Sequence, residues 1–173
     1  ISFSYHINTF DYPTVHGHYD YWEFTLLTDG KLNNVLNDKQ IPVNAGQIFF
    51  STTDDTHCLK KVGGEKLRYI NVIAREESVK NLASSFSPDF FDKLKNMTRK
   101  HTFPNELITQ INEIIHQVLL LSDDAMEEYN GLLCGAVMIF MQFLYRKSVD
   151  YIDYDKQSEQ PEWVQKLNKE MKK

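Results

Sequence analysis

Short extended runs separated by turn residues fill residues 1–75, and their spacing constrains the possible folds more than any other feature of the sequence. The runs are FSYHINTF, YWEFTLLT, LNNVLN, QIFFST, HCLKKV and LRYINVIA. The dipeptides Asp29-Gly30 and Asn37-Asp38 stand between runs and are typical of tight turns. Strands of this length at such close intervals predict an antiparallel β-barrel or sandwich.

The periodicity changes at about residue 76. After Pro104, apolar residues recur at helical spacing, which predicts a helix over residues 105–122. A second helix is expected over residues 127–147, with basic residues at its C-terminal end. Apolar residues surround the middle of this second helix, which indicates burial on more than one side. Two partners for its second side remain open: the rest of its own domain, or another copy of the chain.

The C-terminal segment, residues 149–173, differs in composition from the helical region before it. SVDYIDYDKQSEQ is polar and acidic, as is typical of a linker. It is followed by PEWVQKLNKEMKK, in which Pro161 suits a first helical position and Trp163, Val164, Leu167 and Met171 form a narrow apolar stripe. We expect this short helix to open a further domain.

Composition excludes several classes of protein. The net charge of -5 argues against nucleic-acid binding by these 173 residues themselves, because such binding depends on clustered Lys and Arg. Cys58 and Cys134 are far apart in the sequence, so neither a disulfide framework nor a thiolate zinc cluster is expected, and a reducing cytoplasm is the expected location. The longest apolar run, LLCGAVMIFMQFL, falls short of the roughly 20 residues that span a bilayer, so we expect no membrane partner.

Four potential metal ligands occur in the β half. In HGHYDYWE, His16 and His18 alternate, and side chains at i and i+2 of a strand share a face. Glu23 follows within reach, and His57 begins another strand. Imidazoles and a carboxylate with open positions suit one divalent ion of zinc, nickel, manganese or iron. The alternative is that these histidines are hydrogen-bonded core or pocket groups that hold no ion.

The two stretches resemble the two motifs of the cupin superfamily, a small β-barrel of jelly-roll topology. The matching positions are His16, His18, Glu23 and Gly30 in the first motif, and Gly46 and His57 in the second. Thr52 and Asp54 depart from the second motif, which usually has proline and glycine there. The resemblance implies that the three histidines and the glutamate form one metal quartet.

From about residue 12 to 173 the chain also resembles the sensor half of AraC-family transcription regulators. In that family a cupin barrel binds a small effector, a helical pair dimerises, and a linker leads to a C-terminal domain of two helix-turn-helix motifs. The resemblance implies a cupin barrel over residues 1–75, a helical region with a dimerisation hairpin over 76–148, and a linker with the start of an absent DNA-binding domain over 149–173.

These features predict the α+β class: an N-terminal cupin jelly-roll barrel, then an antiparallel helical pair and a short terminal helix. The expected assembly is a homodimer through helices 105–122 and 127–147, which contacts DNA only through the absent domain. Many family members have one residue fewer between the second histidine and the glutamate. His18 is therefore the predicted ligand most open to displacement.

Aromatic residues lie in or beside the motif strands, where rings stack on sugars while polar groups bind hydroxyls. We therefore expect a saccharide or sugar phosphate as effector. The predicted contacts are Tyr19, Tyr21, Trp22, Glu23, Phe50 and His57. Because strand side chains alternate, about half of the rings must instead fill the core. The basic residues that could hold a phosphate at the rim, or serve only solubility, are Lys31, Lys60, Lys61, Lys66 and Arg68.

Three functions compete. The first is a non-enzymatic effector sensor, in which ligand shifts the balance between two arrangements of the chain. The second is a metal-dependent cupin enzyme, an isomerase or dioxygenase with the quartet as Lewis acid. The third is a free-standing sugar-binding module. The long helical and linker region after the barrel favours the sensor, because a small cupin enzyme does not need it.

Overall fold

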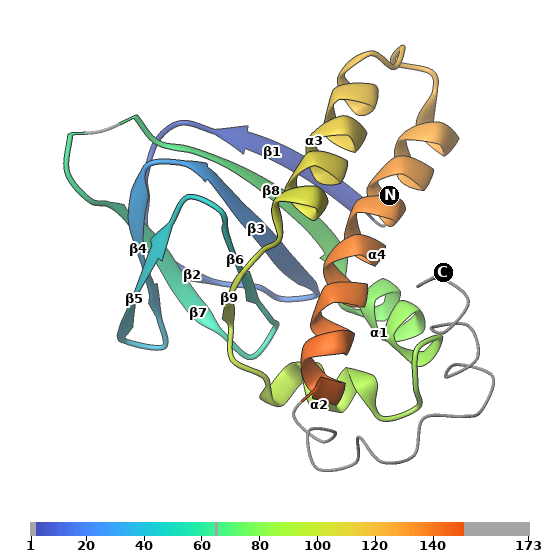
Figure 1. The fold of residues 1–173 in the computed structure, drawn as a ribbon, viewed down its shortest axis with the longest axis horizontal. Helices are drawn as coiled ribbons and strands as arrows, with labels where there is room; N and C mark the ends of the chain where they lie inside the picture. The colour runs from blue at the N-terminus through green and yellow to red at the C-terminus, as the bar shows by residue number, and fades with distance from the viewer. Residues whose placement is uncertain (1–2, 65, 151–173) are drawn as a thin grey trace, which may run out of the picture.

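The computed structural model describes residues 3–64 and 66–150 (Figure 1). Over these residues the strands are β1 (Phe3–Asn8), β2 (Tyr12–Gly17), β3 (Tyr21–Asp29), β4 (Lys31–Leu36), β5 (Lys39–Asn44), β6 (Gln47–Ser51), β7 (Thr56–Lys61), β8 (Arg68–Arg75) and β9 (Lys100–Thr102). The helices are α1 (Glu76–Ser84), α2 (Phe90–Asn96), α3 (Asn105–Leu119) and α4 (Met126–Asp150). The terminal helix predicted from Pro161 onward lies outside the described residues.

The strands form two antiparallel sheets. One has the order β1-β8-β3-β6-β9 and the other β2-β7-β4-β5, so the chain passes repeatedly from one sheet to the other. The helices gather on one side of the barrel, against the five-stranded sheet (Figure 1). This jelly-roll barrel followed by helices confirms the predicted α+β class and the cupin fold.

Two predicted turns have the backbone that their residues favour. Asn37 and Asp38 both have positive φ, 48° and 64°, and they join β4 to β5 as a two-residue hairpin. Gly30 has φ 83°, and a Cβ atom at this position would lie 2.2 Å from the carbonyl oxygen of Lys66. Only glycine fits between β3 and β4.

The five-stranded sheet is buried on both faces. Its inner face meets the other sheet around a cluster inside the barrel formed by Leu27, Leu32, Val43, Phe49, Leu59, Leu67 and Tyr69. Its outer face packs on the helices, where the ring centroids of Phe24 and Phe140 lie 5.7 Å apart. Burial on both faces explains why apolar residues occupy consecutive positions in these strands, as at Leu26-Leu27 in β3 and Val72-Ile73 in β8.

The helix α4 passes across the outer face of the sheet, beside α3. It is long and apolar enough, by length and composition alone, to cross a membrane between Met126 and Val149. Core helices of globular domains meet the same criterion, and Val137, Phe140 and Leu144 of α4 are fully buried in the shared core. The predicted second helix thus exists, and it begins and ends slightly outside residues 127–147.

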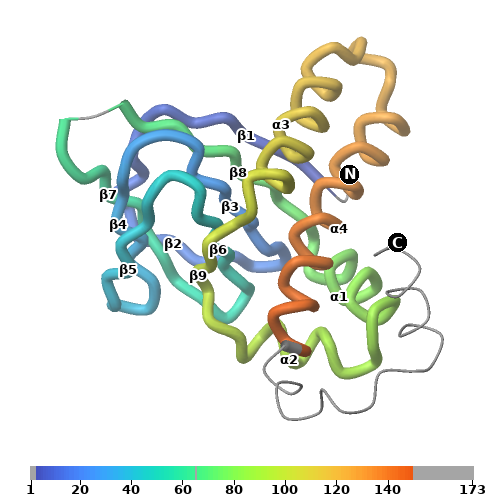
Figure 2. Tube along the Cα trace, viewed as in Figure 1, coloured from blue at the N-terminus to red at the C-terminus, as the bar shows by residue number. Residues whose placement is uncertain are grey.

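Several elements were not anticipated. The edge strands β2 and β5 each contain a proline, Pro13 and Pro42, which interrupts the strand pattern but is tolerated at a sheet edge. The three-residue β9 lies within the region expected to be helical and joins β6, beside which it runs in Figure 2. The helices α1 and α2 are too short for their periodicity to stand out.

Candidate metal centre

The predicted metal quartet is assembled in the barrel. One ligand atom from each of His16, His18, Glu23 and His57 lies within 4.8 Å of the others. The Nε2 atom of His18 lies 3.6 Å from Oε1 of Glu23, and Nε2 of His57 lies 3.5 Å from Oε2 of the same carboxylate. Both separations exceed an ordinary hydrogen bond. They suit groups that face a common ion.

Three elements position these side chains. Antiparallel pairing of β2 with β7 places His16 directly opposite His57. Glu23 comes from β3 in the other sheet, so the quartet bridges the two sheets. His18 follows the end of β2, and the bend at Tyr19 and Asp20 accommodates the extra residue before β3. The expected displacement of His18 therefore does not occur.

Hydrogen bonds on the far side of two rings orient the ligand nitrogens. Nδ1 of His16 donates to the carbonyl oxygen of Thr14 at 3.1 Å, which leaves the lone pair of Nε2 free. Nδ1 of His57 lies 3.2 Å from the hydroxyl of Ser51. Contacts of this kind fix the tautomer and ring orientation of metal-binding histidines.

The buried ring nitrogens of His18 and His57 have the environment that a metal ligand requires. Nε2 of His57 and both ring nitrogens of His18 are buried with no hydrogen-bond partner among residues 3–64 and 66–150. Burial, with the nearby His16 and His18, lowers the pKa of His57 to about 3, and burial also lowers the pKa of His18. Both rings are therefore neutral near pH 7 and can donate a lone pair. Each buried polar atom without a partner lowers the stability of the fold by about 1–3 kcal/mol. A divalent ion bound to these nitrogens would remove that cost.

A cavity of about 310 Å³ opens over the quartet. Its lining is mostly polar: His6 and Asn8 come from β1, Tyr69 and Asn71 from β8, and Tyr12 and Tyr21 begin β2 and β3. Burial raises the pKa of Tyr69 to about 12, so its hydroxyl stays protonated and can donate a hydrogen bond. The volume lies near the lower limit for small-molecule sites, roughly 300 Å³.

Only part of the predicted ligand-binding set lines this cavity. Tyr21, Glu23 and His57 do so. Tyr19 is 96% exposed on the bend before β3. Trp22 and Phe50 point to the opposite face of the sheet, where their rings stack at 6.1 Å and pack among the helices. These three aromatics therefore lie outside the site: Tyr19 is on an exposed bend, and alternation along β3 and β6 directs Trp22 and Phe50 to the outer face.

Sequence reasoning missed a cavity residue and a buried amide in the barrel. His6 had no partner at ligand spacing, and only the pairing of β1 with β8 brings it opposite Asn71. Asn34 was also missed: it is fully buried on β4, and both polar atoms of its amide lack a hydrogen-bond partner among the described residues. Its position between the inward-facing Leu32 and Leu36 was the available signal, because a polar residue interrupts an apolar face there.

Fold and quartet together define a cupin-type barrel with a candidate metal centre. No family model matches the sequence, and no curated protein matches it. Among solved structures, the chain is similar to a cupin protein from Bacteroides fragilis, with 16% identity over 43% of this chain and 67% of that chain (TM-score 0.41).

Two further similar structures are of proteins named for an activity. A predicted oxalate decarboxylase from Thermotoga maritima is 22% identical over 42% of this chain and 64% of that one (TM-score 0.37). A putative sugar phosphate isomerase from Acidithiobacillus ferrooxidans is 18% identical over 43% of this chain and 51% of that one (TM-score 0.39). In both cases the chain spans less than two thirds of the similar structure.

Proposed function

We propose that the chain is the effector-sensing and dimerisation part of an AraC-type transcription regulator, and that its barrel holds one divalent ion and a small polar effector. The observation that carries this proposal is the double role of β3. Glu23 faces the cavity, whereas its neighbours Trp22 and Phe24 pack on the opposite face among the helices. A shift of Glu23 at the quartet would therefore be passed to the helices through the residues next to it in β3.

Close contacts make this connection stiff. Phe24 stacks on Phe140 of α4, and the indole nitrogen of Trp22 donates to Oε2 of Glu76 in α1 at 2.9 Å. Packed cores of this kind have discrete arrangements and do not deform continuously. Ligand contacts that draw Glu23 toward the cavity would therefore favour one arrangement of α1 and α4 over another.

A second connection runs through the loop between β6 and β7. Asp55, two residues before His57, is buried and accepts hydrogen bonds from Nε of Arg99 at 2.9 Å and from Asn37 at 2.8 Å. Burial would raise the pKa of Asp55, but hydrogen bonds from Thr52, Asn37 and Arg99 lower it overall, so the carboxylate stays charged. Arg99 also donates to the carbonyl oxygen of Leu94 in α2. The loop beside the quartet is thus tied to the helical region.

The cavity supports a polyhydroxyl effector. Amide, phenol and imidazole groups offer both donors and acceptors around the quartet, as sugar hydroxyls require. Within the AraC family the sequence resembles the chitobiose-operon regulator, so we propose a saccharide or sugar phosphate.

The proposed assembly is a cytoplasmic homodimer through α3 and α4. Beside its buried face, α4 carries partly exposed apolar residues, Leu132, Cys134, Met138 and Ile139. A second copy could cover them, as expected for a helix that is apolar all round. DNA would be contacted only by a domain that follows the linker.

The quartet itself favours a second candidate, a metal-dependent cupin enzyme of the isomerase or dioxygenase type. An ion held by three imidazoles and Glu23 would act as a Lewis acid and polarise an oxygen of the substrate. The two candidates differ in what binding does to the helices. A sensor requires a response in α4, whereas an enzyme of this type does not.

Hydrogen exchange with mass spectrometry distinguishes the sensor from the enzyme. The purified chain is compared with and without Zn²⁺, Ni²⁺, Mn²⁺ or Fe²⁺, and then with chitobiose added. The sensor predicts slower exchange both in β2 and β7 and in the middle of α4. Phe140→Leu should weaken the α4 response while β2 and β7 still respond, and His57→Ala should abolish both. Binding at the quartet with unchanged exchange in α4 would refute the sensor and leave the enzyme.

A further inference from the structure

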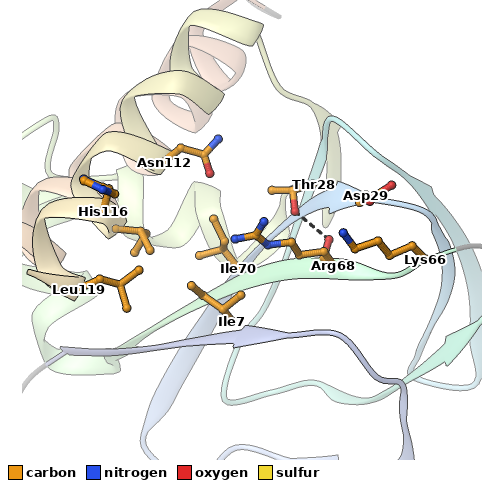
Figure 3. A pocket seen from close by; sticks show the side chains of 10 residues that line it. Ile7, Thr28, Asp29, Lys66, Arg68, Ile70, Asn112, His116 and Leu119 are labelled. Atoms are coloured by element: carbon orange, nitrogen blue, oxygen red, sulfur yellow. Dashed lines mark hydrogen bonds between the residues drawn. The ribbon is translucent and has the colours of Figure 1, made fainter.

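A second cavity lies outside the barrel, between the outer face of the five-stranded sheet and α3 (Figure 3). Its volume is about 440 Å³, larger than the cavity over the quartet. Ile7 of β1 and Ile70 of β8 form an apolar floor, and Ile115 and Leu119 of α3 form an apolar wall. The quartet takes no part in it.

One end of this cavity is basic. Lys66 and Arg68 line it, and neither side chain has a carboxylate within 4.0 Å among the residues that the structure describes. Figure 3 shows the guanidinium of Arg68 directed toward α3, where Asn112 and His116 lie opposite. The hydroxyl of Thr28 donates to the carbonyl oxygen of Arg68 at 2.9 Å, which fixes the backbone at this point.

Asp29 is the one described lining residue with a carboxylate. It forms no salt bridge with Lys66 or Arg68, although it pairs with Arg68 across β3 and β8, and in Figure 3 it lies beside Lys66 at the end of the cavity far from α3. The donors that face the interior are therefore a planar guanidinium, an ammonium and the amide of Asn112. Among side chains, the fork of arginine is the best match for a carboxylate or phosphate.

We infer that this cavity is a second ligand site, which binds a small organic anion: a carboxylate or phosphate group carried on an apolar body. The anionic group faces Arg68, Lys66 and Asn112, and the apolar body covers Ile70 and Ile115. Two cations that face a hollow in a chain of net charge -5 are poorly explained by solubility alone. A ligand here touches the sheet and α3 together, so its binding stabilises their packing.

The test uses two anions with the same apolar body, sodium benzoate and phenyl phosphate, and the neutral benzyl alcohol. Each is titrated into the ¹⁵N-labelled chain, and the backbone amide resonances are followed. We expect at least one anion to shift resonances at residues 66–70 and 112–119, and benzyl alcohol to bind more weakly. The anion that binds tighter identifies the head group.

Arg68→Gln should weaken this binding by about tenfold or more, the scale of a charge-assisted bidentate contact. Lys80→Gln is the matched control: it removes one positive charge at an exposed position on α1 outside the cavity, and affinity should not change. The inference is overturned if neither anion shifts these resonances at millimolar concentration, if benzyl alcohol binds equally well, or if Arg68→Gln has no effect. Shifts confined to residues of the barrel cavity would also overturn it, without bearing on the quartet.

Discussion

His57 is the residue on which the barrel site most depends. It is 1% exposed, its Nδ1 contacts Ser51, and its Nε2 has no hydrogen-bond partner among the described residues. A neutral imidazole in this setting suits metal binding and resists protonation. The same burial makes the stability of the fold depend on pH to a measurable extent.

The pH dependence has a definite sign. The pKa of His57 falls from 6.5 when unfolded to about 3 when folded, so between these values the unfolded chain binds the proton more readily. With a chelator present, stability that exists above pH 6.5 should therefore be lost as pH falls toward 3, by up to about 1.4 kcal/mol per pH unit. Urea unfolding at a series of pH values measures this. In His57→Ala the slope between pH 6.5 and 4 should flatten, and an unchanged slope would exclude His57 as its source.

Asn34 gives a second test at this scale. Its amide is fully buried and unpaired among the described residues. Asn34→Leu has similar volume and removes the cost of burying the amide, so the ligand-free chain should gain about 1–2 kcal/mol in free energy of unfolding. Asn33→Leu, on the other face of β4, is the control and should change little. A loss of stability in Asn34→Leu alone would mean that the amide has a partner inside the barrel.

At the scale of single elements, β3 joins the cavity to the helices. Trp22 donates to Glu76, which also accepts from Thr53. Trp22→Phe keeps an aromatic ring but removes this donor and part of the buried indole, and should lower the free energy of unfolding by at least about 1.5–3 kcal/mol, the scale of hydrogen bonds to charged groups. The double-mutant cycle with Glu76→Ala, which removes the acceptor, isolates the pair when followed by chemical denaturation. Additive effects of the two substitutions would contradict a direct link between β3 and α1.

The strands also show which parts of the site could be predicted from the sequence and which could not. The quartet was predictable because its ligands fall in two local stretches whose spacing is a property of adjacent strands. The cavity lining was not, because His6 and Asn71 meet only through the long-range register of β1 with β8. Trp22 was placed wrongly although alternation carried the signal, because a Glu23 that faces the barrel directs Trp22 to the outer face. Phe50 could be placed only through the pairing of β3 with β6, in which its neighbour Ser51 lies opposite Glu23. The strands β2 and β5 were missed because their edge positions tolerate proline.

At the scale of the whole molecule, the structure shows which positions of α4 can test dimerisation. Phe140 and Leu144 are fully buried in the chain's own core, so polar substitutions there would disrupt the fold as well as any interface. Met138, partly exposed on α4, is a better position. Met138→Lys should convert the proposed dimer to a monomer in light scattering while circular dichroism stays unchanged. A folded Met138→Lys variant that remains dimeric would place the interface elsewhere.

The central claim is that His16, His18, Glu23 and His57 together bind one divalent ion. Native mass spectrometry with elemental analysis of the purified chain tests it most directly. We expect one ion of zinc, nickel, manganese or iron per chain, and a loss of at least about tenfold in affinity in His57→Ala, with His116→Ala unaffected. A chain that stays metal-free when supplied with all four ions, or a His57→Ala variant that binds as tightly as the parent, would contradict it.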